Sequence, residues 1–269
     1  VEVITNPGAQ YDAEVESVSK IKTRKLTAEG LSIRNDANVS YNKWLSGYEE
    51  LGMKYQTKKF EIINDAYIYS SAFGEDNNLD FNIHTDKDDI KVKQYIPIST
   101  RQTDVSEYVA SDYWVNDRNS IGASYHYYTL IESNTTGWSR QEITRNGVME
   151  GIVNATEEMI PKPHRHTLNA YYQGKIGQMG IDLNGTYYYG TDKRNDLTIE
   201  TSEELDNRNV HSNSKESNHM YAAKLILDYP VLGGKLKLGA ELSKTKSHGV
   251  FINEEGFVSS SETDIKENN

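Results

Sequence analysis

Two histidines separated by one residue are the first candidates for metal chemistry in this sequence. His164 and His166 would lie on one face of a strand, where imidazole nitrogens can bind a transition metal. Pro161 and Pro163 stand beside them and favour a junction between a loop and a strand. We therefore predict that neither histidine is a metal ligand.

The acidic run Asp86-Lys87-Asp88-Asp89 is a candidate calcium loop. It lacks the glycine and the distal glutamate of an EF-hand, so a solvated charge run is favoured. Gly174, Gly177 and Gly180 fall in a hairpin turn rather than between a strand and a helix, and they predict no phosphate loop.

No other pattern points to catalysis. Serine, histidine and acidic residues are plentiful, but nothing in the sequence brings them together as a triad. The sequence predicts no catalytic residue, no metal, no cofactor and no enzyme. It identifies no individual ligand-binding residue.

The elements that would position these side chains are β-hairpins. Apolar and polar residues alternate with period two from Tyr221 to Tyr229, a Gly-rich turn follows at residues 230–234, and the alternation resumes from Leu236 to Leu242. The stretch 181–189 repeats the pattern. We predict an all-β, antiparallel, up-and-down architecture with about nine strands, at residues 37–42, 51–56, 60–73, 108–115, 121–127, 167–173, 181–189, 221–229 and 236–242.

Three local expectations accompany this series. A turn is predicted at residues 45–47, and a slip in the alternation near Asn64 predicts a β-bulge. The polar run 262–269 predicts no closing strand. If the sheet spans a membrane, the aromatic residues near strand ends are expected at the two interfaces between membrane and water. These residues are Trp44, Tyr48, Tyr55, Trp114, Tyr187 and Tyr229.

Past the first hairpin, short turns alternate with long polar segments at residues 74–104, 133–163 and 191–216. The first of these could hold extended hairpin arms around Asp86. Outer-membrane barrels show this alternation, with short turns toward the periplasm and long loops outside. A sandwich with Greek-key connections would not be expected to alternate this strictly.

Composition excludes some classes of protein. No apolar run approaches the roughly 20 residues that a transmembrane helix needs. A mean hydropathy of −0.73 suits a soluble protein, but a membrane barrel is polar as well, because alternate residues face a wet interior. The net charge of −11 argues against a nucleic-acid groove. Nineteen tyrosines suit strands and interfaces, and the absence of cysteine excludes a disulfide scaffold.

The N-terminal residues carry a family resemblance. The stretch VEVITNPGAQYDAE at residues 1–14, with IKTRK at residues 21–25, resembles the end of the plug domain in TonB-dependent outer-membrane receptors, in the outer-membrane β-barrel subfamily with the Asn-Pro form. Short strands are expected at residues 1–4 and 18–23. The chain departs from the family at residues 15–18, where relatives usually carry a glycine-rich stretch, so the local packing of the plug stays open.

The resemblance implies a plug end at residues 1–25 and the N-terminal part of a transmembrane barrel at residues 26–269. Plugged transporters close with about 22 strands, so the chain is expected to be a piece of something longer. It implies TonB-dependent uptake of an unidentified nutrient, a small molecule or an oligomer, across the cell outer membrane of a Gram-negative bacterium. The partners implied are outer-membrane lipid and the energy-coupling protein TonB, reached through an upstream segment.

Two other classes of function stay open from the residues alone. An outer-membrane barrel enzyme would need a catalytic cluster on its loops or rim. A soluble secreted β-rich protein that binds glycans or forms a surface structure would stay in the aqueous phase without detergent. The three long segments are the places where a ligand is expected to bind in each case.

Overall fold

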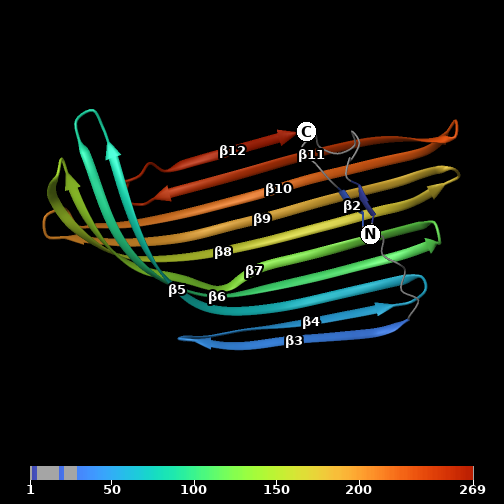
Figure 1. The fold of residues 1–269 in the computed structure, drawn as a ribbon, viewed down its shortest axis with the longest axis horizontal. Coiled ribbons are helices and arrows are strands. Elements are labelled where there is room, and N and C mark those ends of the chain that lie inside the picture. The colour runs from blue at the N-terminus through green and yellow to red at the C-terminus, as the bar shows by residue number, and fades with distance from the viewer. Residues whose placement is uncertain (1, 5–17, 21–28, 269) are drawn as a thin grey trace.

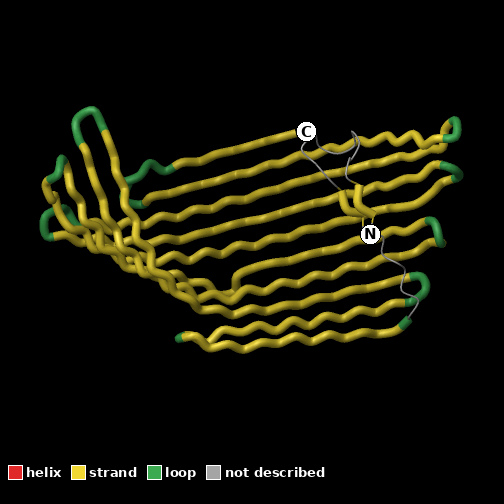
Figure 2. Tube along the Cα trace, viewed as in Figure 1, coloured by secondary structure: helices red, strands yellow, loops and turns green. Residues whose placement is uncertain are grey.

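The computed structural model describes residues 2–4, 18–20 and 29–268 of the 269, and all its regular elements there are β-strands (Figures 1 and 2). Among these residues, no helix is long and apolar enough to cross a membrane. The strands run antiparallel, and each pairs with its neighbours in the chain, so the predicted all-β, up-and-down architecture is confirmed.

Ten strands form one sheet in the unbroken order β12 to β3. Their bounds are β3 (Gly30–Asn42), β4 (Trp44–Gln56), β5 (Phe60–His84), β6 (Asp89–Asn116), β7 (Asn119–Arg145), β8 (Val148–Ile176), β9 (Met179–Ser202), β10 (Arg208–Val231), β11 (Gly234–Asn253) and β12 (Ser261–Asn268). The sheet is curved and open, with β3 and β12 at its two edges (Figure 1).

A second, two-stranded sheet pairs β1 (Glu2–Ile4) with β2 (Val18–Lys20) in antiparallel register. These strands match the cores of the two short strands predicted near the N-terminus. The other residues of the plug-like motif lie outside the described part of the chain. The assignment of residues 1–25 to a plug and of 26–269 to a barrel therefore stays a prediction.

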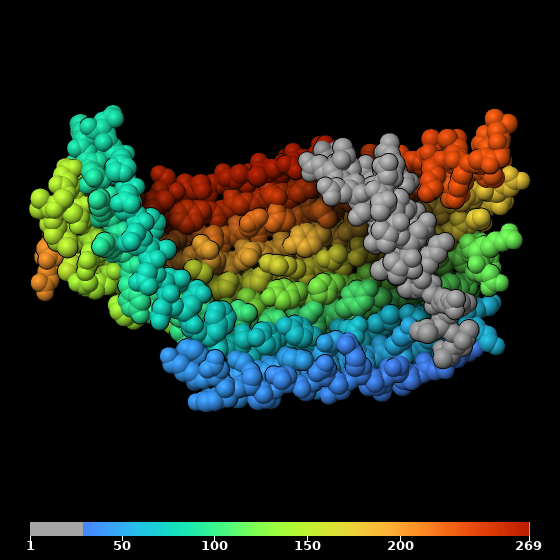
Figure 3. All heavy atoms as spheres, in the orientation of Figure 1, coloured from blue at the N-terminus to red at the C-terminus, as the bar shows by residue number. Residues whose placement is uncertain are grey.

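The three long polar segments are mostly strand. They form the outer halves of β5 to β10, which meet in hairpin ends at residues 85–88, 146–147 and 203–207. The hairpin arms considered for 74–104 are confirmed, whereas the interpretation of 133–163 and 191–216 as loops is wrong. The sequence did not predict these strands because both surfaces of a hairpin outside a core can be solvated. Their residues are therefore polar and resemble those of a loop. In the space-filling view, the blue-green β5–β6 arm stands out from the sheet at the end opposite the short turns (Figure 3).

Strand length confirms how far the arms extend. β8 has 29 residues and β6 has 28. At about 3.3 Å per residue, such strands reach roughly 90 Å, about three times the hydrocarbon thickness of a bilayer. Each long strand is therefore much longer than a single membrane crossing would need.

Three local expectations are wrong. The first hairpin turns at Lys43, whose φ of 66° is left-handed, and not at residues 45–47. β12 pairs with β11 although its sequence is polar, because a strand at an edge can keep charged side chains in water. β5 has no bulge at Asn64: its register against β4 and β6 is continuous. The irregularities lie in the β6–β7 and β7–β8 pairings, for example between Thr103 and Asp104.

The sheet has almost no core. Among the described residues, only Val153 and Ala155 are buried apolar side chains, while dozens of large apolar side chains are exposed. A soluble β protein of this size would bury one apolar sheet face against another layer. The exposed apolar side chains are therefore the feature that a functional account must explain.

Candidate functional site

The register sorts the exposed side chains onto two faces, because residues directly opposite in neighbouring strands share a face. We call face I the side of the sheet that carries Leu183, which pairs with Tyr172 and Leu225, and face II the opposite side, which carries Asn184 and Lys224. Near the short turns, face I is apolar across β3 to β11. Its further members are Leu31, Ile33, Met53, Tyr55, Phe60, Ile62, Val109, Tyr113, Ile121, Tyr125, Leu168, Tyr187, Tyr221, Leu227, Tyr229, Leu236, Leu238 and Leu242.

We call this set the apolar band. It runs along β9 from Ile181 to Tyr189 and along β10 from Tyr221 to Tyr229, close to the roughly 9 to 11 residues of a tilted membrane crossing. Its side chains are open to the surroundings: Leu183 is 45% exposed and Leu238 is 60% exposed. A surface of this kind is unfavourable in water and favourable in hydrocarbon.

Face II is polar at the same level of the sheet. The Tyr171 hydroxyl donates to Asp112 over 2.6 Å, and Lys224 pairs with Glu241 at 3.0 Å. Other cross-strand ion pairs on this face are Lys54–Glu61 at 2.7 Å, Lys235–Asp228 at 3.1 Å and Arg34–Glu50. Charges that are paired and hydrogen-bonded in this way suit a wet interior.

A pair of polar side chains interrupts the apolar band between β5 and β6. Asn64 on β5 donates a hydrogen bond to Glu107 on β6, and both side chains belong to face I. Glu107 stands in the row that closes the band toward the arms, directly opposite Tyr127. The pair therefore lies close to the margin of the band that faces the arms.

On β7 to β10, this margin is formed by neighbouring aromatic and histidine side chains, which we call the aromatic–histidine ladder. Its members are Tyr125, Tyr127, His166, Tyr187, Tyr189, His219 and Tyr221. Ring centroids lie 4.9 Å apart for Tyr127 and His166, 5.8 Å for His166 and Tyr189, and 4.7 Å for Tyr189 and His219. The Oη atom of Tyr125 is 2.8 Å from Nδ1 of His166. Aromatic rings with one polar end are typical of the boundary between hydrocarbon and water.

The two histidines considered as metal ligands have hydrogen-bonding partners in and beside the ladder. His164 and His166 share face I as predicted, but Nδ1 of His164 lies 3.2 Å from the hydroxyl of Tyr127 and 3.1 Å from that of Thr129. Within the described ranges, no group of three possible metal ligands occurs. The sequence missed the ladder because its members come together only through the pairing of four strands.

The aromatic residues that were expected at the interfaces divide between the two faces. Tyr55, Tyr187 and Tyr229 lie on face I, in the apolar band. Tyr48 and Trp114 lie on face II, whereas the ring of Trp44, at the end of its hairpin, stands against Gly74 of face I. Nearness to a strand end could not separate the two groups, because a shift of one residue moves a side chain to the other face.

In the β5 to β8 arms, the polarity of the faces is exchanged. Most apolar side chains there lie on face II, and face I carries residues such as Asp80, Lys91 and Glu142, together with Tyr95, Trp138 and Ile152. The apolar set, which we call the arm surface, consists of Leu79, Phe81, Ile83, Ile90, Val92, Ile96, Ile98, Ile143, Val153 and Ala155. This exchange is the expected result if hydrocarbon surrounds the band and water surrounds the arms.

The arm surface is partly covered by its own chain. Ser139 and Ala155 are directly opposite each other and are 0% and 3% exposed. A Cβ on Gly151 would meet side-chain atoms of Glu204 and Leu205 at 3.2 and 3.4 Å, so the β9–β10 hairpin end lies against this side of β8. Burial, together with the charge of Glu200, raises the pKa of Glu157 at the edge of the surface. The arm surface is therefore the apolar part of face II, partly shielded by the β9–β10 hairpin end.

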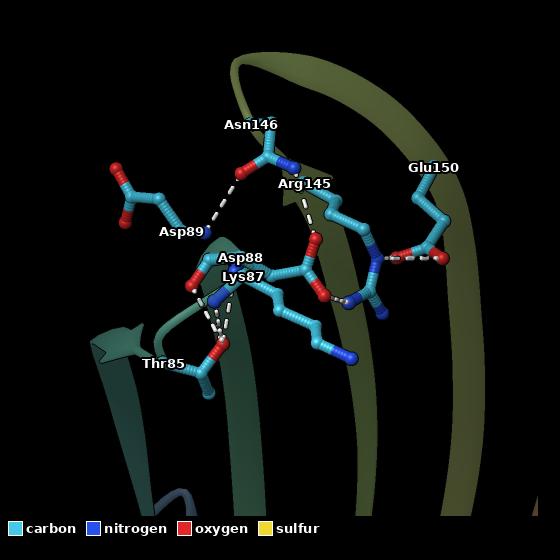
Figure 4. Close-up of polar contacts among 7 residues, drawn as sticks. All are labelled: Thr85, Lys87, Asp88, Asp89, Arg145, Asn146 and Glu150. Carbon is cyan, nitrogen blue, oxygen red and sulfur yellow. Dashed lines mark hydrogen bonds and ion pairs between the residues drawn. The ribbon is translucent and has the colours of Figure 1, made fainter.

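A polar latch joins the tips of the β5–β6 and β7–β8 arms (Figure 4). Arg145 lies between Asp88, at 3.0 Å, and Glu150, at 3.1 Å. Asn146 donates to Asp88 over 2.9 Å and accepts from the backbone N–H of Asp89 over 2.8 Å. The hydrogen bonds to Glu150 and the nearby carboxylates raise the pKa of Arg145, so its charge is secure at neutral pH.

The latch accounts for the acidic run that was considered as a calcium loop. The Thr85 hydroxyl accepts hydrogen bonds from the N–H groups of Lys87, at 3.4 Å, and Asp88, at 2.9 Å, which closes the turn (Figure 4). The carboxylate of Asp88 is then occupied by Arg145 and Asn146. The run therefore joins two hairpin tips.

We expect Arg145→Met to loosen the two tips. An exposed ion pair contributes up to about 1 kcal/mol, so amide hydrogen exchange at residues 85–88 and 146–147 should accelerate about fivefold in the folded parent protein. Arg140→Met is the matched control, because Arg140 pairs with Glu142 in its own strand. Equal exchange at the tips in both variants would show that the latch does not hold the arms together.

On face I, a hollow of about 950 Å³ lies at the base of the arms, where the β3–β4 hairpin ends. Trp44, Trp138 and Asp76 are among its lining residues, and Tyr95 packs edge-on against Trp138 with ring centroids 5.5 Å apart. A Cβ on Gly74 would come within 2.8 Å of the Trp44 ring, so the glycine makes room for the indole. The hollow therefore lies on the side of the sheet opposite face II.

Comparisons with known proteins give a likeness of shape only. No protein-family model matches the chain, and no curated protein matches it. Among solved structures, it is similar to the ferric citrate transporter FecA in its unliganded form, with 7% identity, a TM-score of 0.40, and coverage of 90% of this chain and 40% of that one. It is also similar to the siderophore receptor PiuA from Acinetobacter baumannii, with 10% identity, a TM-score of 0.34, and coverage of 94% and 47%.

A third similar structure is the ferric preacinetobactin receptor BauA from Acinetobacter baumannii, with 9% identity and a TM-score of 0.33. That match covers 90% of this chain and 45% of the receptor. The chain spans less than half the length of each of the three proteins. A likeness at this level does not assign a family.

Proposed function

We propose that this chain is part of an outer-membrane β-barrel receptor that imports a nutrient with energy coupled through TonB. The observation that carries the proposal is the apolar band, which is exposed on face I directly behind a charged and hydrogen-bonded face II. A sheet with these two faces is stable where hydrocarbon meets one side and water the other. The exchange of polarity in the β5 to β8 arms supports the same placement.

The proposed mechanism divides the chain along its strands. The apolar band crosses the bilayer, face II of that zone lines the wet interior, and the short turns face the periplasm. The arms stand outside the cell, where the arm surface takes part in capturing the ligand, a small molecule or an oligomer. Residues 1–25 form the end of a plug, as their resemblance to TonB-dependent receptors suggests, and plug rearrangement lets the ligand pass.

The unpaired edges β3 and β12 are part of the proposal. A bilayer does not tolerate a lipid-exposed sheet edge, because each unsatisfied backbone group costs several kcal/mol there. We therefore propose that further strands complete the barrel between β12 and β3. No catalytic role, metal or cofactor belongs to the proposed function.

The test is fractionation of the full-length parent protein from its native cell. We expect recovery in the outer membrane and faster gel mobility in unboiled samples than in boiled ones, because a closed barrel resists detergent until heated. Recovery in the soluble fraction, with no effect of boiling, would refute the membrane proposal. That outcome would favour a secreted β-rich binding protein.

A further inference from the structure

Three lysines oppose one another across neighbouring strands on face I. Lys162 on β8 pairs with Lys193 on β9, which pairs with Lys215 on β10. All three side chains are exposed. Side chains in directly opposed positions have Cβ atoms about 5 Å apart, so the three lysine side chains leave the sheet side by side as one row of positive charge.

This row has no counter-charge of its own. Like charges directly opposite each other destabilise a sheet. No ion pair of these lysines occurs in the described part of the chain. Two carboxylates of face I, one on the same strand as Lys162 and one in the row of Lys215, have other partners. Glu158 accepts from Asn134 over 2.8 Å, and Glu262 lies 3.8 Å from His248.

The position of the row relative to the apolar band is specific. Along β8, Lys162 stands four residues beyond His166 of the aromatic–histidine ladder, on the side away from the band. At about 3.3 Å per residue this is roughly 13 Å, and a lysine stem can span half of that distance. The ammonium groups can therefore reach the level at which lipid headgroups begin.

Two further features of face I belong to the same surface. Lys246 on β11 pairs with Lys266 on β12 in the row that contains His219, so the basic area continues toward the edge of the sheet. Beside the row, Ile160, Val250 and Ile252 line a shallow groove with Lys162, Lys193 and Lys215. Positive charge beside an apolar groove suits a ligand that has both anionic and apolar parts.

We infer that Lys162, Lys193 and Lys215 bind the anionic headgroup of an outer-leaflet lipid, at phosphate or carboxylate groups. The inference rests on the proposed function, since it requires face I to be surrounded by lipid. The bound anion neutralises a row of charges that the sheet leaves unpaired and attaches the bases of the β7–β10 arms to the membrane surface. A free phosphate ion offers the same charge chemistry without the anchor.

The experiment uses the full-length parent protein, refolded into zwitterionic phosphatidylcholine vesicles. The probes are bis-phosphorylated lipid A, added to the vesicles, and inorganic phosphate at the same phosphate concentration. The test variant carries Lys162→Gln, Lys193→Gln and Lys215→Gln. The control variant carries Lys175→Gln, Lys224→Gln and Lys237→Gln, which removes the same charge from face II.

The result expected is that the control variant binds lipid A like the native protein, whereas the test variant binds about 100-fold more weakly. Near a membrane surface, each lysine contributes about 1 kcal/mol toward anionic lipid, and three lysines together give this factor. Inorganic phosphate should bind far more weakly than lipid A in every variant. Both variants must keep the heat-dependent gel shift, which reports that the barrel is closed.

Each contrary outcome has a distinct meaning. Equal lipid A affinity in the native protein and the test variant, with the barrel intact, would overturn the lysine site and leave the proposed function in place. Inorganic phosphate that binds as tightly as lipid A would also overturn the lipid assignment. A native protein that forms no heat-shifted species would refute the proposed function instead.

Discussion

Leu183→Arg is expected to prevent the parent protein from assembling stably in a membrane. Leu183 lies within the apolar band and is 45% exposed, so in the proposed barrel an arginine there would stand in hydrocarbon near the centre of the bilayer. An arginine at the midplane of a barrel costs about 2–4 kcal/mol. The measurement is the free energy of unfolding in phospholipid vesicles, followed by tryptophan fluorescence in urea.

Asn184→Arg is the matched control for this change. Asn184 is the next residue of β9 and lies on face II, where its amide donates to Asp182 over 2.5 Å and Lys224 is directly opposite. An arginine there would remain in water, so the free energy of unfolding should change by less than about 1 kcal/mol. If both substitutions cost the same, or if Leu183→Arg costs nothing, the apolar band does not face lipid.

Gly122→Val should be the most destabilising substitution on the polar face. A Cβ at Gly122 would collide with side-chain atoms of Asp112 and Tyr171, whose mutual hydrogen bond of 2.6 Å lies across the glycine. Valine would displace the ring and break that bond. Overpacking and a lost hydrogen bond together cost about 2–4 kcal/mol, measured by the same urea titration.

Gly185→Val tests whether the effect is specific to the site. Gly185 is also a strand glycine, but a Cβ there would meet nothing closer than the Ala170 carbonyl oxygen at 4.0 Å. Its side of the sheet is the apolar band, so valine should leave stability unchanged or raise it slightly. In addition, Tyr171→Ala should remove part of the cost of Gly122→Val, as expected for side chains in contact. Additive costs would contradict the proposed collision.

The sequence predicted the architecture because its determinants are local. Period-two alternation in the stretches 181–189 and 221–229 defines strands with two unlike faces, and the Gly-rich turn at 230–234 makes the hairpin antiparallel. The same local logic failed in the arms. There the alternation is between polar residues, or apolar residues change face, as on β5 between Ile62 and Phe81, and the change resembled a bulge near Asn64.

Features of the candidate site were predicted correctly where they depend on a single strand. The spacing of His164 and His166 correctly placed both on one face of a strand. Tyrosines near strand ends were assigned less well, because the face of each one depends on a register that a single strand does not reveal.

The sequence by itself determined that this protein is an antiparallel β meander whose strands near the short turns have one apolar and one polar face. Only the tertiary structure decided which distant residues stand opposite one another. The latch of Arg145 with Asp88, the aromatic–histidine ladder, and the row Lys162, Lys193 and Lys215 all arise in this way. The physical reason is that alternation within a strand is a local property, whereas cross-strand register is fixed by the hydrogen-bond ladder over the whole length of each hairpin.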